Sequence, residues 1–140
     1  MNLKRKNNKG FTLIEIIVVL VIMVIMAAIA IPAVTGYIKD AKNSKYVQET
    51  HSIYTVMQTE EAKAKALGKE VKYDDTAASD AVVAKADLIV IINNKMEDTG
   101  IEVNDITKAG GKYTVKFTSD TRNVTVEFTP NSDDMKVTVE

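Results

Sequence analysis

The stretch from residue 9 to residue 38 reads KGFTLIEIIVVLVIMVIMAAIAIPAVTGYI, and the rest of the chain is organised around it. After Glu15 this stretch contains no charged side chain. An α-helix rises about 1.5 Å per residue, and about 20 apolar residues cross the hydrocarbon core of a bilayer. The stretch is therefore long enough to form a membrane-spanning helix.

The rest of the 140 residues leaves room for one small soluble domain of roughly 100 residues. Cysteine is absent, so neither a disulfide nor a thiolate metal site can form. The head that follows the apolar stretch must be stabilised by non-covalent packing alone.

Charge is distributed unevenly along the chain. Four cations precede the apolar stretch, namely Lys4, Arg5, Lys6 and Lys9. Beyond Gly10, 14 Lys and Arg side chains stand against 19 Asp and Glu side chains, a net charge of -5. Cations on one flank of a spanning helix keep that flank in the cytoplasm, so the acidic remainder should face outward. An acidic surface also argues against nucleic acid as a partner.

Three interpretations of the opening compete. A secretory signal peptide would need a shorter apolar core, although Ala28-Ile29-Ala30 could imitate its cleavage site. The second interpretation is a plain membrane-anchored protein that is never cleaved. The third interpretation uses Gly10, Phe11 and Glu15 together.

Lys-Gly-Phe-Thr-Leu-Ile-Glu followed by about twenty apolar residues resembles the class III signal of type IV pilins and pseudopilins. The resemblance implies that a membrane aspartyl peptidase, the prepilin peptidase, cuts between Gly10 and Phe11 and N-methylates Phe11. It further implies a leader at residues 1–10, a transmembrane and polymerisation helix at 11–38, and a pilin head at 39–140.

Glu15 is costly inside hydrocarbon and is a functional candidate for that reason. A carboxylate so near the helix end could instead reach the lipid headgroups. If the chain is cut after Gly10, the Phe11 ammonium of one subunit can meet the Glu15 carboxylate of its neighbour in a low dielectric. The resemblance to pilins implies the same pairing, which would drive and register polymerisation.

Pro32 lies inside the apolar helix, where it removes a backbone hydrogen bond to Ala28. We expect a kink or a weak point there, either as a tolerated membrane kink or as a place where the rod bends during assembly. Pilins often carry a helix-loosening glycine about eight residues earlier, where this chain has Val24. Small residues nearby permit close packing of identical helices: Ala27, Ala28, Ala30 and Ala33.

The helix should continue beyond Lys39 to a stop at Gly68, giving one helix of roughly 55 residues. Its expected apolar stripe consists of Val47, Thr50, Tyr54, Met57, Ala64 and Leu67. His51 is the one histidine of the chain and has no companion at metal-ligand spacing, so we expect a surface or packing residue.

Between this helix and the C-terminal part the pattern is less regular. Residues 68–79 are expected to form a loop. Residues 79–93 fit a helix with Ser79 as N-cap, although the run LIVII at residues 88–92 would also suit a buried strand. A short strand is possible at residues 101–103.

Three segments near the C-terminus alternate apolar and polar side chains, at residues 113–118, 124–129 and 135–139. Their linkers are short and rich in turn formers, which predicts an antiparallel β-meander with one apolar face. The outer half of the long helix offers an apolar stripe to cover that face. The expected fold is therefore α+β, a pilin fold in which a long N-terminal helix, half of it transmembrane, packs on a C-terminal meander.

No catalytic set is apparent, and no cofactor or metal is expected. Asp133 and Asp134 with Asn131, or Asp74 and Asp75, could bind calcium, but they lack the regular spacing of a calcium loop. Asn123-Val124-Thr125 matches a glycosylation sequon, for which a turn is a sufficient explanation.

These expectations describe a structural subunit and not an enzyme. The subunit would be a major type IV pilin, held in the membrane by a single span before assembly and polymerised afterwards into a surface fibre for adhesion, motility or biofilm formation. Its partners would be other copies of itself, the prepilin peptidase, the pilus assembly machinery and the membrane. The alternative is a pseudopilin of a type II secretion or DNA-uptake system.

Overall fold

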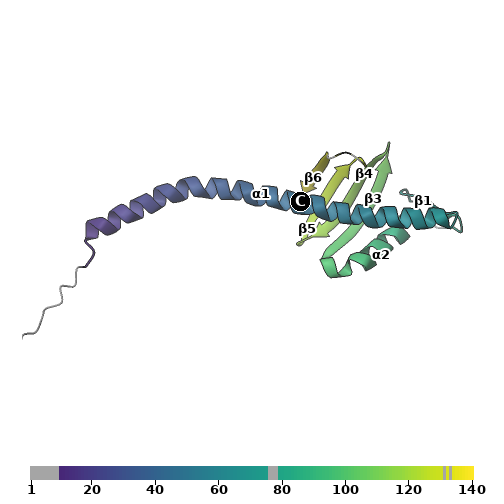
Figure 1. The fold of residues 1–140 in the computed structure, drawn as a ribbon, viewed down its shortest axis with the longest axis horizontal. Helices are drawn as coiled ribbons and strands as arrows, with labels where there is room; N and C mark the ends of the chain where they lie inside the picture. Colours follow the sequence, from purple (N-terminus) through teal and green to yellow (C-terminus); the bar gives the residue numbers. More distant parts are fainter. Residues whose placement is uncertain (1–9, 76–78, 131, 133) are drawn as a thin grey trace, which may run out of the picture. The chain divides into compact units, whose positions relative to one another are not determined.

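The computed structural model describes residues 10–75, 79–130, 132 and 134–140. The leader cations at Lys4, Arg5, Lys6 and Lys9, and the calcium candidates Asn131 and Asp133, lie outside the described residues. The elements in chain order are α1 (Leu13–Ala66), β1 (Glu70–Val71), β2 (Val82–Val83), α2 (Lys85–Met96), the 3₁₀ turn η1 (Glu97–Thr99), β3 (Ile101–Ala109), β4 (Lys112–Ser119), β5 (Arg122–Phe128) and β6 (Met135–Val139) (Figure 1).

The chain divides into two compact units, residues 1–40 and residues 41–140. Helix α1 contributes to both and runs for 54 residues. It ends as predicted at Gly68, whose φ of 74° lies in the left-handed region that favours glycine. The Lys69 amide donates to the Ala64 carbonyl at 2.8 Å, and the Gly68 amide donates to the Lys65 carbonyl at 3.0 Å. These two bonds form a Schellman motif, which satisfies carbonyls of the last turn.

The head, residues 41–140, contains a four-stranded antiparallel sheet in the order β3-β4-β5-β6. The predicted apolar faces are correct. Every apolar residue of those faces in β4 and β5 is buried, whereas those of the edge strand β6 are half-buried. The α+β fold with a long N-terminal helix and a C-terminal antiparallel meander is therefore confirmed.

Strand β3 is much longer than the three residues predicted, and a β-bulge explains why its pattern was missed. Val103 pairs with Phe117 and Asp105 with Lys116, so Asn104 is an extra residue in β3. The bulge moves Ile106 onto the same buried face as Val103, although the two are an odd number of residues apart. The strict alternation of apolar and polar residues therefore stops at residue 103, and a strand predicted from a period of two residues ends there.

The buried stripe of α1 differs in part from the predicted one. Thr50, Met57 and Ala64 are buried as expected. Tyr46 and Ile53 are buried in place of their neighbours Val47 and Tyr54, which are half-buried. The sheet packs against a row of α1 residues that is rotated slightly about the helix axis from the predicted row. The 3.6-residue period alone does not fix the position of that row. Leu67, predicted on the same face, is 75% exposed.

The segment before the sheet contains the helix that we expected, but its start was wrong. Helix α2 begins at Lys85 with Ala84 as N-cap, so Ser79 caps nothing. Residues 82–83 instead form β2, which pairs in parallel with β1 inside the segment expected to be a loop. The run LIVII is helical and places Leu88 and Ile92 in the core.

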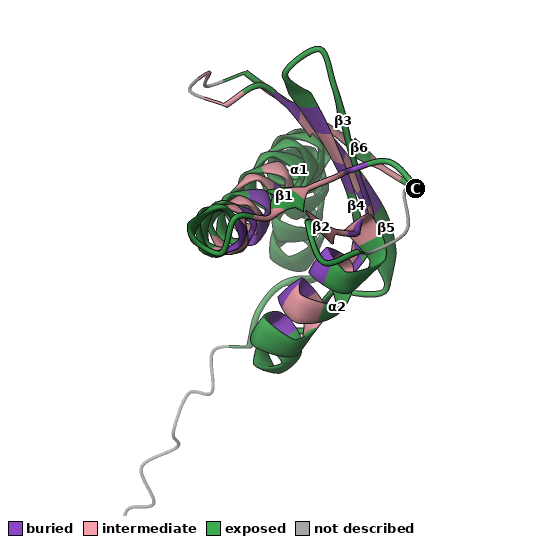
Figure 2. Ribbon diagram, turned by 90° about the vertical axis from the view of Figure 1, so that its right-hand side faces the viewer, coloured by how far each residue is buried: buried purple, intermediate pink, exposed green. Residues whose placement is uncertain are grey.

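The core of the head joins α1, α2 and the sheet (Figure 2). Its fully buried members come from all three, for example Ile53 from α1, Ile92 from α2 and Phe117 from β4. Tyr54 packs edge-on against Tyr113 and Phe128, with ring centroids 5.5 and 5.1 Å apart. All core residues lie at or after Tyr46.

Candidate functional site

The candidate site is the beginning of α1, where Gly10 and Phe11 directly precede the helix and Glu15 lies in its first turn. Gly10 and Phe11 precede the helix and are exposed, Phe11 by 85%. A peptidase can therefore reach the bond between them without unfolding a helix. Pro32 lies 17 residues after Glu15, about 25 Å further along the axis.

Glu15 closes a capping box with Thr12, the residue just before the helix. The Thr12 amide and the Thr12 hydroxyl both donate to Glu15 Oε2 at 2.7 Å. In return the Glu15 amide donates to the Thr12 Oγ1 atom at 3.3 Å. These bonds satisfy backbone donors that would otherwise have no partner at a helix start.

Thr12 is the functional residue that our sequence analysis missed. The signal was present, because Thr-x-x-Glu before an apolar run is the capping-box spacing. The carboxylate also lies in the first turn of α1, where the helix dipole favours an anion. Glu15 thus has a partner within its own chain as well as the expected one in a neighbour.

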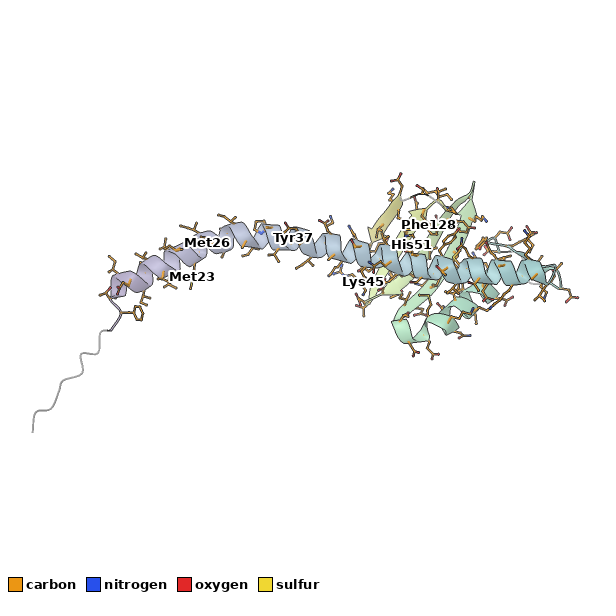
Figure 3. All side chains as sticks on the ribbon, viewed as in Figure 1. Met23, Met26, Tyr37, Lys45, His51 and Phe128 are labelled. Carbon is orange, nitrogen blue, oxygen red and sulfur yellow. The ribbon has the colours of Figure 1, made fainter. Side chains whose placement is uncertain are left out.

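Among the described residues of the first unit, 10–40, no apolar side chain is buried. The exposed large residues run from Phe11 to Ile38, and Figure 3 shows Met23, Met26 and Tyr37 projecting from α1. Within the described residues, α1 is the helix long and apolar enough to cross a membrane. The apolar surface is therefore free to contact lipid or other copies of the chain.

Pro32 does not interrupt α1. The helix is continuous through this residue, and the Thr35 hydroxyl donates to the Pro32 carbonyl at 2.9 Å. The backbone bond that Ala28 would accept is missing because proline has no amide hydrogen. A bend at Pro32 during assembly remains a prediction.

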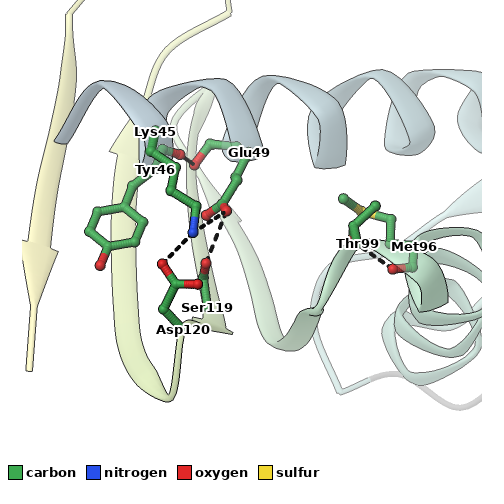
Figure 4. A network of polar contacts seen from close by, with 8 residues as sticks. Lys45, Tyr46, Glu49, Met96, Thr99, Ser119 and Asp120 are labelled. Atoms are coloured by element: carbon green, nitrogen blue, oxygen red, sulfur yellow. Dashed lines mark hydrogen bonds and ion pairs between the residues drawn. The ribbon is translucent and has the colours of Figure 1, made fainter. Parts of the chain in front are cut away.

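Charged and polar groups tie α1 to the head at several points. At one of them, Lys45 pairs with Asp120 in the β4–β5 turn, and the Ser119 hydroxyl donates to Glu49 at 2.9 Å (Figure 4). Asp120 and Thr121 both have positive φ, 51° and 65°. The ion pair with Asp120 raises the pKa of Lys45. This cluster fixes a tight hairpin turn to the helix.

A second cluster surrounds Glu61, which accepts from the Tyr73 hydroxyl at 2.5 Å. Burial raises the pKa of Tyr73, and the hydrogen bond to Glu61 raises it further. Lys108 lies 4.7 Å from the centre of the Tyr113 ring and 3.9 Å from Glu61. These contacts hold the segment after α1 against the sheet.

The remaining candidates behave as surface groups. His51 is exposed on α1, as expected. Asp75 pairs with Lys85 at 2.8 Å, and the described residues contain no group of three potential metal ligands that could hold an ion.

Comparison with known proteins adds one match. The family model "Prokaryotic N-terminal methylation motif" matches residues 5–31. Neither the curated proteins nor the solved structures contain a significant match to this chain. The matched region holds the whole capping box and the start of the apolar helix.

The chain therefore carries the class III signal of type IV pilins, and the resemblance noted in the sequence is confirmed. A type IV pilin-like or pseudopilin protein is the class that this motif defines. Such a motif points to a structural subunit rather than an enzyme, and it implies processing by a prepilin peptidase and assembly into pilus-like polymers. The apolar helix is compatible with membrane anchoring before assembly.

Proposed function

We propose that this chain is the major subunit of a type IV pilus, a surface fibre used for adhesion, motility or biofilm formation. The prepilin peptidase cuts between Gly10 and Phe11 and methylates the new amino group of Phe11. The mature chain stays in the membrane through the helix at residues 11–38 until that helix enters the fibre. The methylation motif at residues 5–31, together with the apolar part of α1 up to Ile38, in which no described side chain is buried, is the observation that carries this proposal.

Assembly would bring two charges together. In the mature chain the Phe11 ammonium lies one residue before Thr12, the first residue of the capping box. Glu15 accepts its local bonds through Oε2, which leaves Oε1 for a cation from another copy. In the low dielectric of packed apolar helices, an unpaired carboxylate is far costlier than a paired one. The pair therefore favours the register in which Phe11 of one copy reaches Glu15 of the next.

Intact-mass analysis of the mature protein tests the processing step. The expected mass is that of residues 11–140 with one added methyl group. A chain that retains Met1 or is cut elsewhere would refute the proposal.

Replacing Glu15 tests the assembly step. Glu15→Ala should be processed normally and reach the membrane, yet yield at least tenfold fewer fibres by electron microscopy, because the incoming ammonium has no partner. Glu15→Asp keeps the charge on a shorter side chain and should restore part of the yield. Wild-type fibre numbers in Glu15→Ala would show that the charge pair is not needed.

A further inference from the structure

The bond between Gly10 and Phe11 lies next to the place where α1 begins. Gly10, Phe11 and Thr12 are outside the helix, and Leu13 is its first residue. Proteases cut backbone that is exposed and not held in secondary structure. In a helix, by contrast, each amide is bonded to the carbonyl four residues earlier. The position of the helix boundary therefore decides whether the peptidase finds this bond in a form that it can bind.

Thr12 fixes that boundary through two acceptor atoms. Its carbonyl accepts a helix-type bond from the Ile16 amide at 3.3 Å. Its Oγ1 atom accepts from the Glu15 amide, which is the bond that an N-cap residue makes. An N-cap residue has a non-helical backbone conformation. The helix therefore cannot run back past Thr12 while Thr12 caps it.

The Thr12 amide is occupied as well. In a helix that continued toward the N-terminus, this amide would donate to the carbonyl four residues earlier. It donates instead to Glu15 Oε2 at 2.7 Å. The capping box and a helix that includes the Gly10–Phe11 bond therefore exclude each other.

The sequence before Thr12 contains no strict helix breaker. Residues 1–12 include no proline, and Gly10 disfavours a helix without preventing one. The 54 residues of α1 supply a formed helix, so a residue added at its end avoids the cost of nucleation. The bonds of Thr12 are therefore the feature that stops α1 from extending through Phe11 and Gly10.

We infer that Thr12 is a positioning residue for processing, because its cap keeps the Gly10–Phe11 bond outside the helix and available to the prepilin peptidase. The inference rests on the proposed function, from which it takes the position of the cut. It assigns the Thr12 hydroxyl a role before assembly. Glu15→Ala retains the backbone amide of residue 15 and with it the hydroxyl bond, which agrees with the normal processing that we expect of that variant.

Cleavage kinetics of the full-length precursor test this role. We would purify the precursor from cells that lack the peptidase, place it in detergent micelles and add purified prepilin peptidase. Thr12→Ala removes the cap and introduces the best helix former, so α1 is free to run back through Phe11. Only the precursor with a non-helical bond then binds. KM should rise about twofold to fivefold, with kcat unchanged.

Two variants that keep a cap serve as controls. Thr12→Ser and Thr12→Asn both introduce a good N-cap residue, although asparagine has a different shape from threonine. Both should be cut with the KM of the wild type. A peptidase that recognises the threonine side chain itself would reject Thr12→Asn as strongly as Thr12→Ala. That result would overturn the inference, and so would a wild-type KM for Thr12→Ala.

Hydrogen exchange observes the helix boundary without the peptidase. In Thr12→Ala the Phe11 amide should exchange about two to five times more slowly than in the wild type, because it enters the helix. Unchanged exchange at Phe11 in this variant would overturn the inference even if cleavage were slow.

The outcomes also separate this inference from the proposed function. A wild-type precursor that is not cut between Gly10 and Phe11 would remove both. A wild-type precursor that is cut there, with Thr12→Ala cut equally well, would remove the role of Thr12 alone.

Discussion

At the residue scale, Glu15 has two possible partners that act at different times. In the single chain it caps α1 through Thr12, and in a fibre it would also face the ammonium of a neighbour. The capping bonds hold the carboxylate at the start of the helix before any neighbour arrives. Thr12 is therefore a positioning residue in our proposal, and its effect can be separated from that of the charge.

Thr12→Val removes the hydroxyl but keeps the shape of the side chain. We expect the first turn of α1 to open more readily, by about 1 kcal/mol, since loss of an N-cap costs roughly this much. Hydrogen exchange of the first-turn amides, with the chain in detergent micelles, measures the change. Fibres should still form because Glu15 keeps its charge. A loss of fibres as complete as in Glu15→Ala would show that the cap, and not the charge, is essential.

Glu60 gives the head a predictable dependence on pH. It accepts hydrogen bonds from Lys95 of α2 and from Lys63, and these lower the pKa of Glu60 from its ordinary value of 4.5. A carboxylate whose pKa is lower in the folded state than in the unfolded state stabilises the fold at pH values above its unfolded-state pKa. That stabilisation is lost as the pH falls through its folded-state pKa. The head should therefore lose stability below about pH 4.5.

Glu60→Gln should flatten this acid dependence. The variant should be less stable than wild type by about 1 kcal/mol at pH 7, the upper range for a partly exposed ion pair, and the difference should shrink toward pH 3. Urea unfolding at several pH values measures both. Glu97→Gln changes an exposed carboxylate with no ion pair to a described residue and serves as the control. Equal dependence of stability on pH in Glu60→Gln and in the wild type would show that Glu60 does not cause the loss of stability in acid.

At the element scale, a side chain of α2 forms hydrogen bonds with the backbone of the edge strand β3. The Asn93 amide group donates to the Val103 carbonyl at 3.0 Å, and the Val103 amide donates to Asn93 Oδ1 at 2.7 Å. Asn93 thereby occupies the place of a neighbouring strand beside β3. This contact protects an edge that could otherwise pair with another chain.

Replacing Asn93 should weaken the attachment of α2 to β3. Asn93→Ala leaves both Val103 backbone groups without these partners, which costs about 1 to 3 kcal/mol for groups that are largely buried. Urea unfolding gives the stability, and hydrogen exchange should show faster exchange at the Val103 amide. Asn94→Ala alters the exposed neighbour and should change stability by less than about 0.5 kcal/mol. Equal effects of the two variants would mean that the edge contact adds nothing.

At the scale of the whole molecule, the two units have different sources of stability. Every core residue lies at or after Tyr46, while residues up to Asp40 have no buried side chain among those described. In our proposal, lipid or other copies of the chain cover the apolar surface of the first unit. The second unit has its own core and should fold alone.

A fragment of residues 41–140 tests this division. We expect a soluble monomer that unfolds cooperatively, with a melting temperature within about 5 °C of that of the head in the full chain. Circular dichroism and analytical ultracentrifugation measure these properties. A fragment that remains unfolded or aggregates would show that the first forty residues are needed to form the head.

The sequence by itself determined the features that depend on local pattern. The length of α1, its stop at Gly68 and the apolar faces of β4 and β5 follow from composition and from periods of 3.6 and 2 residues. The pilin-type signal is likewise a local motif, and residues 5–31 carry it.

Only the tertiary structure decided which neighbouring residue faces inward and where regular patterns break. Tyr46 is buried and Val47 is not, because the sheet fixes the line of contact along α1. The bulge at Asn104 and the start of α2 at Lys85 depend on partners far away in the chain. Leu67 matches the period of the buried stripe yet is exposed, because α1 ends at Ala66 and Leu67 lies in the turn that follows.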